Sequence, residues 1–203
     1  MKSAIIFDLD GTLWDTTEEI KDVWNKVAKK YNLKIKSAQI KEIMGLTKEE
    51  IINYLFPKNK EKGIEFIEIC QKSENEYLSK NGGHIYKNTL STIKELSLKF
   101  DLYIVSNCQS GYIEAFLEYY SLKQYFKDYE CSGNTGMNKY DNIKNVLKRN
   151  DILKAIYVGD TQKDYESANK NGIPFIWAEY GFGNCNIYYK KIKDICELIN
   201  IEI

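Results

Sequence analysis

Four short runs of apolar residues constrain the fold of this chain more than any other feature. They lie at residues 4–7, 102–105, 155–158 and 173–177, and each ends within a few residues at a polar side chain or a glycine. Short apolar runs with such boundaries are typical of strands that are buried on both faces. Because strands of that kind occur in parallel sheets, the runs predict a parallel sheet at the centre of the fold.

Between and after these runs, apolar residues recur at helical spacing. Strands that alternate with helices indicate an α/β fold with a doubly wound, Rossmann-like sheet. The last group of apolar residues predicts that the chain closes with a helix. The groups are Leu90, Ile93 and Leu96; Ile113, Phe116, Leu117 and Tyr120; Ile143, Val146 and Leu147; and Ile192, Ile195, Cys196 and Ile199.

The stretch 15–83 breaks this alternation. It contains helical segments at 18–31, 48–55 and 60–78 but no convincing strand, and the sequence Asn-Gly-Gly at 81–83 ends it. A parallel crossover needs only about 30 residues, so this stretch is longer than the topology requires. We therefore expect an α/β core made of residues 1–14 and 84–203, with an inserted all-α cap of residues 15–83.

The composition excludes several other classes of protein. Charged residues make up 29% of the chain and hydrophobic residues 43%, as in a globular domain rather than a disordered chain. The 29 basic and 29 acidic residues balance, so no charge excess points to nucleic acid. No apolar run reaches the roughly 18 residues of a membrane span, and no secretory apolar segment is evident. The five cysteines contain no CxxC pair, which is typical of a reduced compartment.

These features predict a cytoplasmic protein with no nucleic-acid or membrane partner. A monomer is the default expectation, and a weak homodimer is the alternative.

Polar residues that suit phosphate chemistry follow three of the predicted strands. In open α/β sheets, ligands bind at the carboxyl ends of the strands, so side chains at those ends are expected to meet. They are Asp8 and Asp10, then Ser106 and Asn107, then Asp160 and Asp164, with Lys139 just before a predicted helix.

The first acidic pair has a chemical consequence of its own. Asp8 and Asp10 point to the same side of their strand, while Leu9 turns into the core. Two neighbouring carboxylates repel each other unless a cation is bound or one of them is protonated. One carboxylate can then attack phosphorus while the other moves a proton. Gly11 frees the backbone for the sharp exit from the strand.

The later polar residues complete a phosphate site. Asp160 and Asp164 add hard oxygen ligands which, together with Asp8, suit Mg²⁺. Ser106 and Lys139 offer a hydroxyl donor and a positive charge to phosphate oxygens, which phosphoryl transfer requires.

The motifs DxDGT at 8–12, Ser106, Lys139 and GDxxxD at 159–164, in this order, resemble those of the haloacid dehalogenase-like (HAD) hydrolase superfamily. The resemblance covers nearly the whole chain. The text DLDGTLWD at 8–15, GDTQKD at 159–164 and YGFG at 180–183 is similar to the phosphoglycolate-phosphatase-like branch with a helical cap.

The resemblance implies a role for each motif residue. Asp8 would be the nucleophile, and Asp10 would protonate the leaving oxygen and then activate water. Mg²⁺ would be held by the Asp8 carboxylate, the Asp10 carbonyl and Asp160, with Asp164 as a direct or water-mediated ligand.

The same resemblance implies how the phosphate is held. Leu9, Thr12, Ser106, the Asn107 amide and Lys139 would form the phosphate site, with Lys139 also neutralising Asp8. Thr12 would orient Asp10 or brace the turn. Lys139 lacks the proline that commonly follows it in the family, and Lys144 is its alternative. Trp14, Trp24 and the segment 44–47 could face the substrate, with helix packing as the other interpretation.

The function that the resemblance implies is that of a Mg²⁺-dependent phosphatase, which hydrolyses a small phosphorylated metabolite through an aspartyl-phosphate. Asp10 favours phosphoryl transfer over dehalogenation, because a halide leaving group needs no acid. The alternatives are a phosphomutase, similar to β-phosphoglucomutase, and a non-catalytic phosphometabolite-binding module.

Overall fold

The structure, a computed structural model, describes residues 3–202. Its centre is a six-stranded sheet of order β5-β4-β1-β6-β7-β8, in which all neighbouring strands are parallel. The four predicted apolar runs form β1, β4, β6 and β7, so the predicted doubly wound α/β sheet is confirmed. The strands are β1 (Ala4–Phe7), β4 (Asp101–Ser106), β5 (Phe126–Cys131), β6 (Ala155–Gly159), β7 (Phe175–Ala178) and β8 (Lys190–Ile192).

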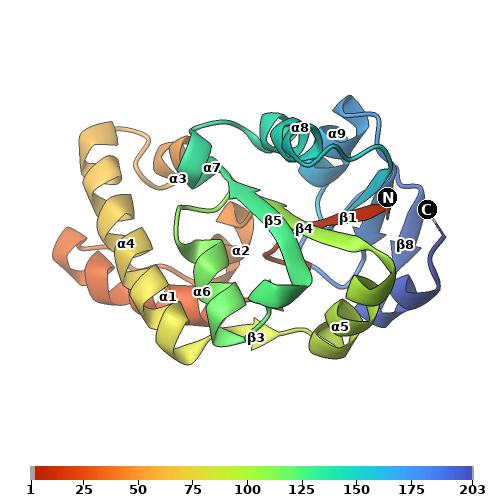
Figure 1. Ribbon diagram of the computed structural model, residues 1–203. Helices are drawn as coiled ribbons and strands as arrows, with labels where there is room; N and C mark the ends of the chain where they lie inside the picture. The colour runs from red at the N-terminus through yellow and green to blue at the C-terminus, as the bar shows by residue number, and fades with distance from the viewer. Residues whose placement is uncertain (1–2, 203) are drawn as a thin grey trace.

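Helices cover both faces of this sheet (Figure 1). On one face lie α8 (Lys139–Arg149) and α9 (Gln162–Lys170); on the other lie α5 (Thr89–Lys99), α6 (Tyr112–Tyr119) and the 3-10 helix η3 (Ile195–Asn200). Side chains alternate along β1, so Ile5 and Phe7 join the apolar cluster on the α5 side, whereas Ala4 and Ile6 join the cluster on the α8 side. Two buried faces explain why the strands are apolar without interruption.

The edges of the sheet and the end of the chain differ from the sequence prediction. The strands β5 and β8 were not expected, because edge strands carry polar side chains such as Lys127 and Lys190 that interrupt an apolar run. The predicted closing helix is shorter than expected: Ile192 ends β8, and the helix that closes the described chain is the 3-10 helix η3, which begins at Ile195. The physical reason is Asp194, whose side chain accepts a hydrogen bond from the Cys196 N–H at 2.9 Å and so begins a new turn. Two short helices, η2 (Lys123–Tyr125) and α7 (Ser132–Thr135), flank β5.

Between β1 and β4 the chain is mainly helical. The three predicted segments are confirmed, and α2 is additional. Thr47 and Glu50 form a reciprocal capping box that starts α3, and Asn59 accepts from the Lys62 N–H at 3.0 Å to start α4. The helices are α1 (Thr17–Ala28) with its 3-10 extension η1 (Lys29–Tyr31), α2 (Ser37–Ile43), α3 (Lys48–Leu55) and α4 (Lys60–Asn81).

A short antiparallel ribbon lies at the two ends of this helical stretch. It consists of β2 (Trp14–Asp15) and β3 (His84–Ile85). The chain therefore leaves and re-enters the core side by side, which is what an inserted helical unit needs. The boundaries at residues 15 and 83 stay a prediction.

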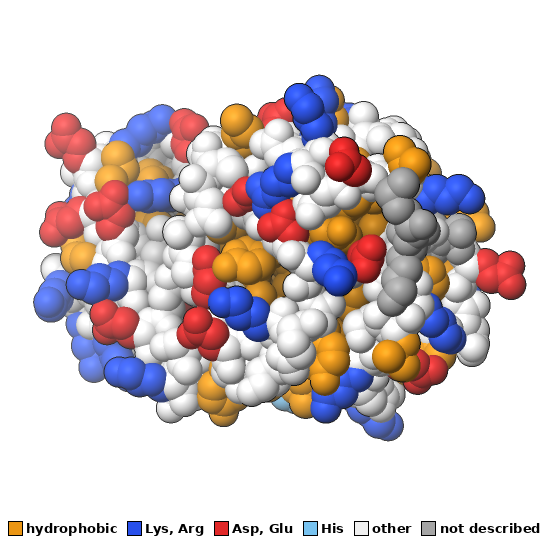
Figure 2. All heavy atoms as spheres, viewed as in Figure 1, with side chains coloured by type: hydrophobic (Ala, Val, Ile, Leu, Met, Phe, Trp, Pro, Cys, Tyr) orange, Lys and Arg blue, Asp and Glu red, His pale blue; other side chains and the backbone are white. Residues whose placement is uncertain are grey.

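The surface seen in Figure 2 carries both signs of charge, with lysine and acidic side chains interspersed. Among residues 3–202, no helix combines the length and the apolar character that a membrane crossing requires.

Candidate active site

The three central strands bring their carboxyl ends to one edge of the sheet. Phe7, the last residue of β1, lies opposite Ile104 of β4 and Val158 of β6. The residues that follow, Asp8 and Asp160, are therefore neighbours, and both are almost fully buried. Ser106, the last residue of β4, is buried beside them.

Three carboxylates converge at this edge. Oxygen atoms of Asp8, Asp160 and Asp164 all lie within 4.8 Å of one another. Asp164 belongs to the first turn of α9, where its Oδ2 accepts from the Thr161 N–H at 3.0 Å and the Thr161 hydroxyl at 2.7 Å. Asp160 Oδ2 accepts from the N–H groups of Phe182 at 2.8 Å and Gly183 at 3.2 Å. No donor within residues 3–202 reaches the other oxygen, Asp160 Oδ1.

One buried lysine joins these acids. The Lys139 Nζ lies 2.9 Å from Asp8 Oδ1 and 2.6 Å from Asp164 Oδ1. Lys139 is the first residue of α8, and the Asn138 side chain caps that helix by accepting from the Asp141 N–H at 3.1 Å. Burial lowers the pKa of Lys139, but the two carboxylates outweigh burial and hold that pKa above its usual value. The alternative, Lys144, is exposed on α8.

The site holds more buried negative charge than one ammonium can balance. Burial raises the pKa of Asp8 to about 6, although Lys139 opposes the rise. Burial, with Asp164 and Asp8 as neighbours, also raises the pKa of Asp160 well above its usual value. An unpartnered buried carboxylate oxygen, surplus negative charge and a donor set made of oxygen alone fit a hard divalent cation such as Mg²⁺.

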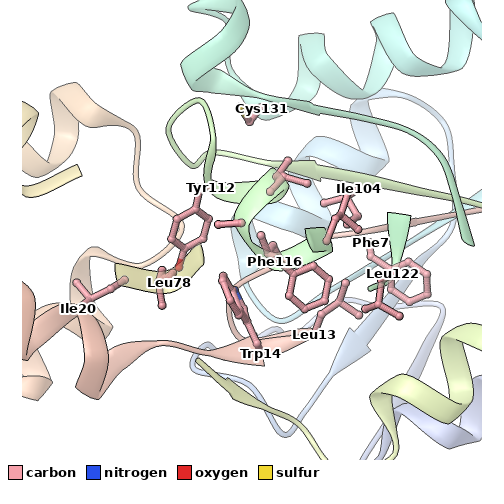
Figure 3. Packing of buried hydrophobic residues seen from close by; sticks show 14 of the residues in the cluster. Phe7, Leu13, Trp14, Ile20, Leu78, Ile104, Tyr112, Phe116, Leu122 and Cys131 are labelled. Atoms are coloured by element: carbon pink, nitrogen blue, oxygen red, sulfur yellow. The ribbon is translucent and has the colours of Figure 1, made fainter. Parts of the chain in front are cut away.

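The second acid, Asp10, is held by partners that the motif does not contain. Its Oδ1 accepts from the Tyr112 hydroxyl at 2.8 Å and from the Thr16 hydroxyl at 3.2 Å. Burial raises the pKa of Asp10 to about 8, while the bond from Tyr112 opposes the rise. In Figure 3, Tyr112 lies between Phe116 of α6 and the side chains of Ile20 and Leu78, which come from α1 and α4.

The prediction that Thr12 orients Asp10 differs from the structure. The buried Thr12 hydroxyl has no hydrogen-bond partner within the described residues, and Thr16 takes that position instead. The Thr12 carbonyl accepts from the Tyr180 hydroxyl at 2.8 Å, which agrees with the other expectation, that this residue braces the turn.

The remaining predicted phosphate ligands sit at the same strand ends. The side chain of Leu9 is buried in the core, and its backbone N–H faces the Asp8 carboxylate. The Asn107 side chain donates to the Gly45 carbonyl at 2.8 Å and accepts from the Ser132 hydroxyl at 3.0 Å. This side chain therefore ties the loop after α2 to the strand ends, and the backbone amide of Asn107 remains a candidate donor to phosphate.

A small cavity of about 50 Å³ adjoins this edge, lined on the core side by Asp10, Ser106 and Asn107. The cap contributes Trp24, Glu74 and the segment 44–46 to its wall. An open cleft of about 780 Å³ lies next to it, between α3 and α4 on one side and residues 132–138 on the other. Trp14 does not face the cavity; it packs edge-on against Phe116 in the core, with ring centroids 5.0 Å apart.

Several residues of the site carry no motif signal. Thr16, Tyr112 and Glu74 reach it only through tertiary packing. The N–H donors of Phe182 and Gly183 are indicated in the sequence by the preceding glycine. Position 181 must be glycine, because a Cβ there would lie 2.3 Å from the Asp160 Cβ. Gly11 is obligatory for a similar reason, with φ of +76° and a Cβ position 2.3 Å from Asp160 Oδ2.

Comparison with known proteins agrees with this geometry. The sequence pattern of the haloacid dehalogenase-like hydrolases matches residues 5–178. The chain is 30% identical over 192 residues to a phosphoglycolate phosphatase of Aquifex aeolicus, covering 90% of this chain and 87% of the relative.

Solved structures share the fold. A haloacid dehalogenase-like family hydrolase of Streptococcus pneumoniae superposes with a TM-score of 0.86 at 21% identity, over 98% of this chain and 97% of the other. A HAD-superfamily hydrolase, subfamily IA, of Geobacter sulfurreducens has a TM-score of 0.74 at 18% identity, over 98% and 95% of the two chains.

Proposed function

This chain belongs to the haloacid dehalogenase-like hydrolase family, and from that premise we propose that it hydrolyses a small phosphorylated metabolite with Mg²⁺, through an aspartyl-phosphate on Asp8. Membership of this family makes the chain a phosphoric monoester hydrolase. The observation that carries the finer proposal is the convergence of Asp8, Asp160, Asp164 and Lys139 at one buried edge of the sheet.

In the first step, a carboxylate oxygen of Asp8 attacks phosphorus and the bond from phosphorus to the ester oxygen breaks. The leaving oxygen takes a proton from Asp10. Because Asp10 Oδ1 already accepts from Tyr112 and Thr16, the proton belongs on Oδ2, to which no described side chain donates. A pKa of about 8 keeps Asp10 protonated at neutral pH.

In the second step, Asp10 acts as the base. Its carboxylate, ionised after the first step, takes a proton from water as that water attacks the phosphorus of the aspartyl-phosphate. The bond to the Asp8 oxygen breaks, phosphate leaves and both side chains return to their starting states. Closure of the cap over the site would limit bulk water during the first step.

The residues that would hold Mg²⁺ are Asp8, the Asp10 carbonyl and Asp160. Both oxygens of Asp164 are engaged by Lys139 and Thr161, so a contact through water suits Asp164 better than a direct one. When bound, the cation would neutralise phosphate oxygens and bring them close to Asp8. Ser106, the amides of Leu9 and Asn107 and the Lys139 ammonium would hold the remaining phosphate oxygens.

Two further parts of the proposal concern the molecule as a whole. We propose that the protein acts as a monomer. The ribbon of β2 and β3 supports a division into a core and a cap close to residues 15 and 83. We place the enzyme in the cytoplasm.

The test is hydrolysis of para-nitrophenyl phosphate with and without Mg²⁺. We expect phosphate release that depends on Mg²⁺ and falls by at least about a thousandfold in Asp8→Asn, because that variant loses the nucleophile. A hexose 1-phosphate as substrate separates hydrolysis, which releases free phosphate, from the phosphomutase alternative, which forms the isomeric phosphate ester. Activity that survives Asp8→Asn would remove the mechanism.

A further inference from the structure

A buried carboxyl group of the cap, Glu74, has no part in the chemistry described above. It lies on α4, is 3% exposed and lines the small cavity of about 50 Å³ together with Asp10 and Tyr112. Its Oε2 accepts from the Trp24 indole N–H at 2.8 Å, and its Oε1 accepts from the Gln109 amide at 2.9 Å. Trp24 belongs to the cap, whereas Gln109 belongs to the core loop that follows β4.

Glu74 is incompletely satisfied. A carboxylate has about four acceptor positions, and only two of them are filled here. Within residues 3–202, no lysine, arginine or histidine forms an ion pair with it, although glutamate is rarely buried without such a partner. Burial raises the pKa of Glu74 to about 7, the direction expected for a carboxyl group without a cation.

The rest of the cavity wall offers little positive charge. Among the described residues, Lys48 is its one basic side chain, and the Lys48 Nζ lies 2.8 Å from Glu68 on the exposed side of the cap. The single arginine, Arg149, pairs with Asp128 and Glu130 on the edge strand β5. A carboxylate placed in this cavity would therefore meet the Glu74 carboxylate without a free cation to balance the two charges.

We propose that Glu74 is a specificity-determining residue for the alcohol half of the substrate. In its ionised form Glu74 accepts a hydrogen bond from an O–H or N–H group of an uncharged or cationic alcohol, and it repels an alcohol that bears a carboxylate. Glycolate is such an alcohol, so this chain would differ in substrate from the phosphoglycolate phosphatase that it resembles. The inference rests on the proposed phosphatase function.

The volume of the cavity limits the size of the alcohol half of the substrate. A volume of about 50 Å³ holds about three to five water-sized groups, at roughly 10–15 Å³ for each. The part of the alcohol that lies in this cavity beside Glu74 is therefore small.

The experiment compares phosphate esters of nearly equal size that differ in the group at the far end of the alcohol from the phosphate. They are 2-hydroxyethyl phosphate, 2-aminoethyl phosphate, n-propyl phosphate and phosphoglycolate, all assayed with Mg²⁺. We expect kcat/KM for the better of the two donor-bearing esters to exceed that for phosphoglycolate by at least about tenfold, the effect of one discriminating polar contact. The kcat/KM for n-propyl phosphate should lie between that of the donor-bearing ester and that of phosphoglycolate. A preference for phosphoglycolate overturns the inference.

The variant Glu74→Gln keeps the shape of the side chain and removes the charge. We expect it to reduce the ratio between the donor-bearing ester and phosphoglycolate by at least about fivefold. The matched control is Glu76→Gln, on the exposed side of the same helix, which should leave the ratio unchanged. If Glu74 only ties the cap to the core, all four esters slow by the same factor and the inference fails.

A binding measurement separates this inference from the proposed function. Asp8→Asn cannot form the covalent intermediate, so calorimetry with this variant, Mg²⁺ and the same four esters reports the order of affinity without turnover. If the wild-type protein hydrolyses none of the esters, the proposed function fails, and the order of binding still decides the role of Glu74. Tighter binding of phosphoglycolate than of both donor-bearing esters overturns it, even where Glu74→Gln does not fold.

Discussion

Asp8 and Asp10 lie two positions apart, both buried, and the proposed reaction needs them in opposite protonation states. Burial raises the pKa of both, but to different extents: to about 6 for Asp8, which Lys139 opposes, and to about 8 for Asp10. Between these values Asp8 is ionised and can attack, while Asp10 is protonated and can donate. The difference comes from the partners, because Asp8 faces an ammonium and Asp10 faces two hydroxyl groups.

The first prediction is a bell-shaped dependence of kcat/KM on pH. Activity should rise as Asp8 loses its proton near pH 6 and fall as Asp10 loses its proton near pH 8. A bound cation favours the ionised form of Asp8, so higher Mg²⁺ should move the acidic limb to lower pH and leave the alkaline limb in place. Steady-state rates over the pH range at two Mg²⁺ concentrations measure this. An alkaline limb that is absent would contradict the role of Asp10 as the acid.

The second prediction concerns Tyr112, whose hydroxyl donates to Asp10 Oδ1 at 2.8 Å. That bond stabilises the ionised carboxylate and lowers its pKa. Tyr112→Phe should therefore move the alkaline limb of the profile to higher pH. The control is Tyr119→Phe, an exposed position on the same helix, which should leave the profile unchanged. If the alkaline limb of the kcat/KM profile lies at the wild-type pH in both variants, Tyr112 does not act on Asp10.

At this scale the sequence predicts the residues that belong to motifs and misses those that packing supplies. Asp8, Ser106 and Asp160 could be predicted because each stands at the end of a strand, and adjacent parallel strands end at the same edge. Tyr112 could not, since 102 positions separate it from Asp10 and only the packing of α6 brings the two together.

At the scale of elements, polar contacts hold the cap against the core. The Asn75 side chain on α4 donates to the Ser110 carbonyl at 2.7 Å and accepts from the Gln109 amide at 3.0 Å. Asn107 adds its bond to the Gly45 carbonyl, and Lys163 of α9 pairs with Glu50 of α3. These contacts close the cavity beside Asp10 with hydrogen bonds that can break and re-form, as substrate entry requires.

The third prediction follows from these contacts. Asn75→Ala removes two hydrogen bonds at the cap–core boundary, a net loss of about 1 kcal/mol because the site is partly exposed. The closed state should become less populated, and KM should rise by about fivefold. Steady-state kinetics measure the change. Lys72→Ala, on an exposed position of the same helix, is the control and should keep the wild-type KM. An unchanged KM in Asn75→Ala would show that these bonds do not hold the cap.

The elements themselves could be predicted where burial is complete. The runs that became β1, β4, β6 and β7 lie inside the sheet, where helices cover both faces, so the buried side chains along the middle of each strand are apolar. Strand β5 could not be predicted in this way, because it lies at an edge of the sheet and its residues FKDYEC alternate irregularly between exposed and buried positions. The closing segment has apolar residues at a spacing that fits a helix, yet Ile192 pairs with β7 and Asp194 interrupts the spacing.

At the scale of the whole molecule, the site costs stability. A carboxyl group whose pKa is raised on folding destabilises the fold as pH rises above its value in the unfolded chain, about 3.9 for aspartate. Asp160 is such a group, and burial together with Asp164 and Asp8 accounts for its raised pKa. At neutral pH the fold therefore carries a repulsion that a bound cation would remove.

The last prediction tests that balance with the complete protein. Mg²⁺ at about a hundred times its Kd should stabilise the fold by about 2.7 kcal/mol, because it binds the folded state and not the unfolded one. Thermal unfolding with increasing Mg²⁺ should therefore show a rising Tm. Asp160→Asn replaces the repelled carboxylate by a neutral amide, so without Mg²⁺ its Tm should equal or exceed that of the wild type, whereas most of the increase with Mg²⁺ should disappear. Asp22→Asn, on an exposed turn of α1, should keep the full increase. If Asp160→Asn lowers the Tm without Mg²⁺ and retains the increase with it, Asp160 is a structural acid and the cation binds elsewhere.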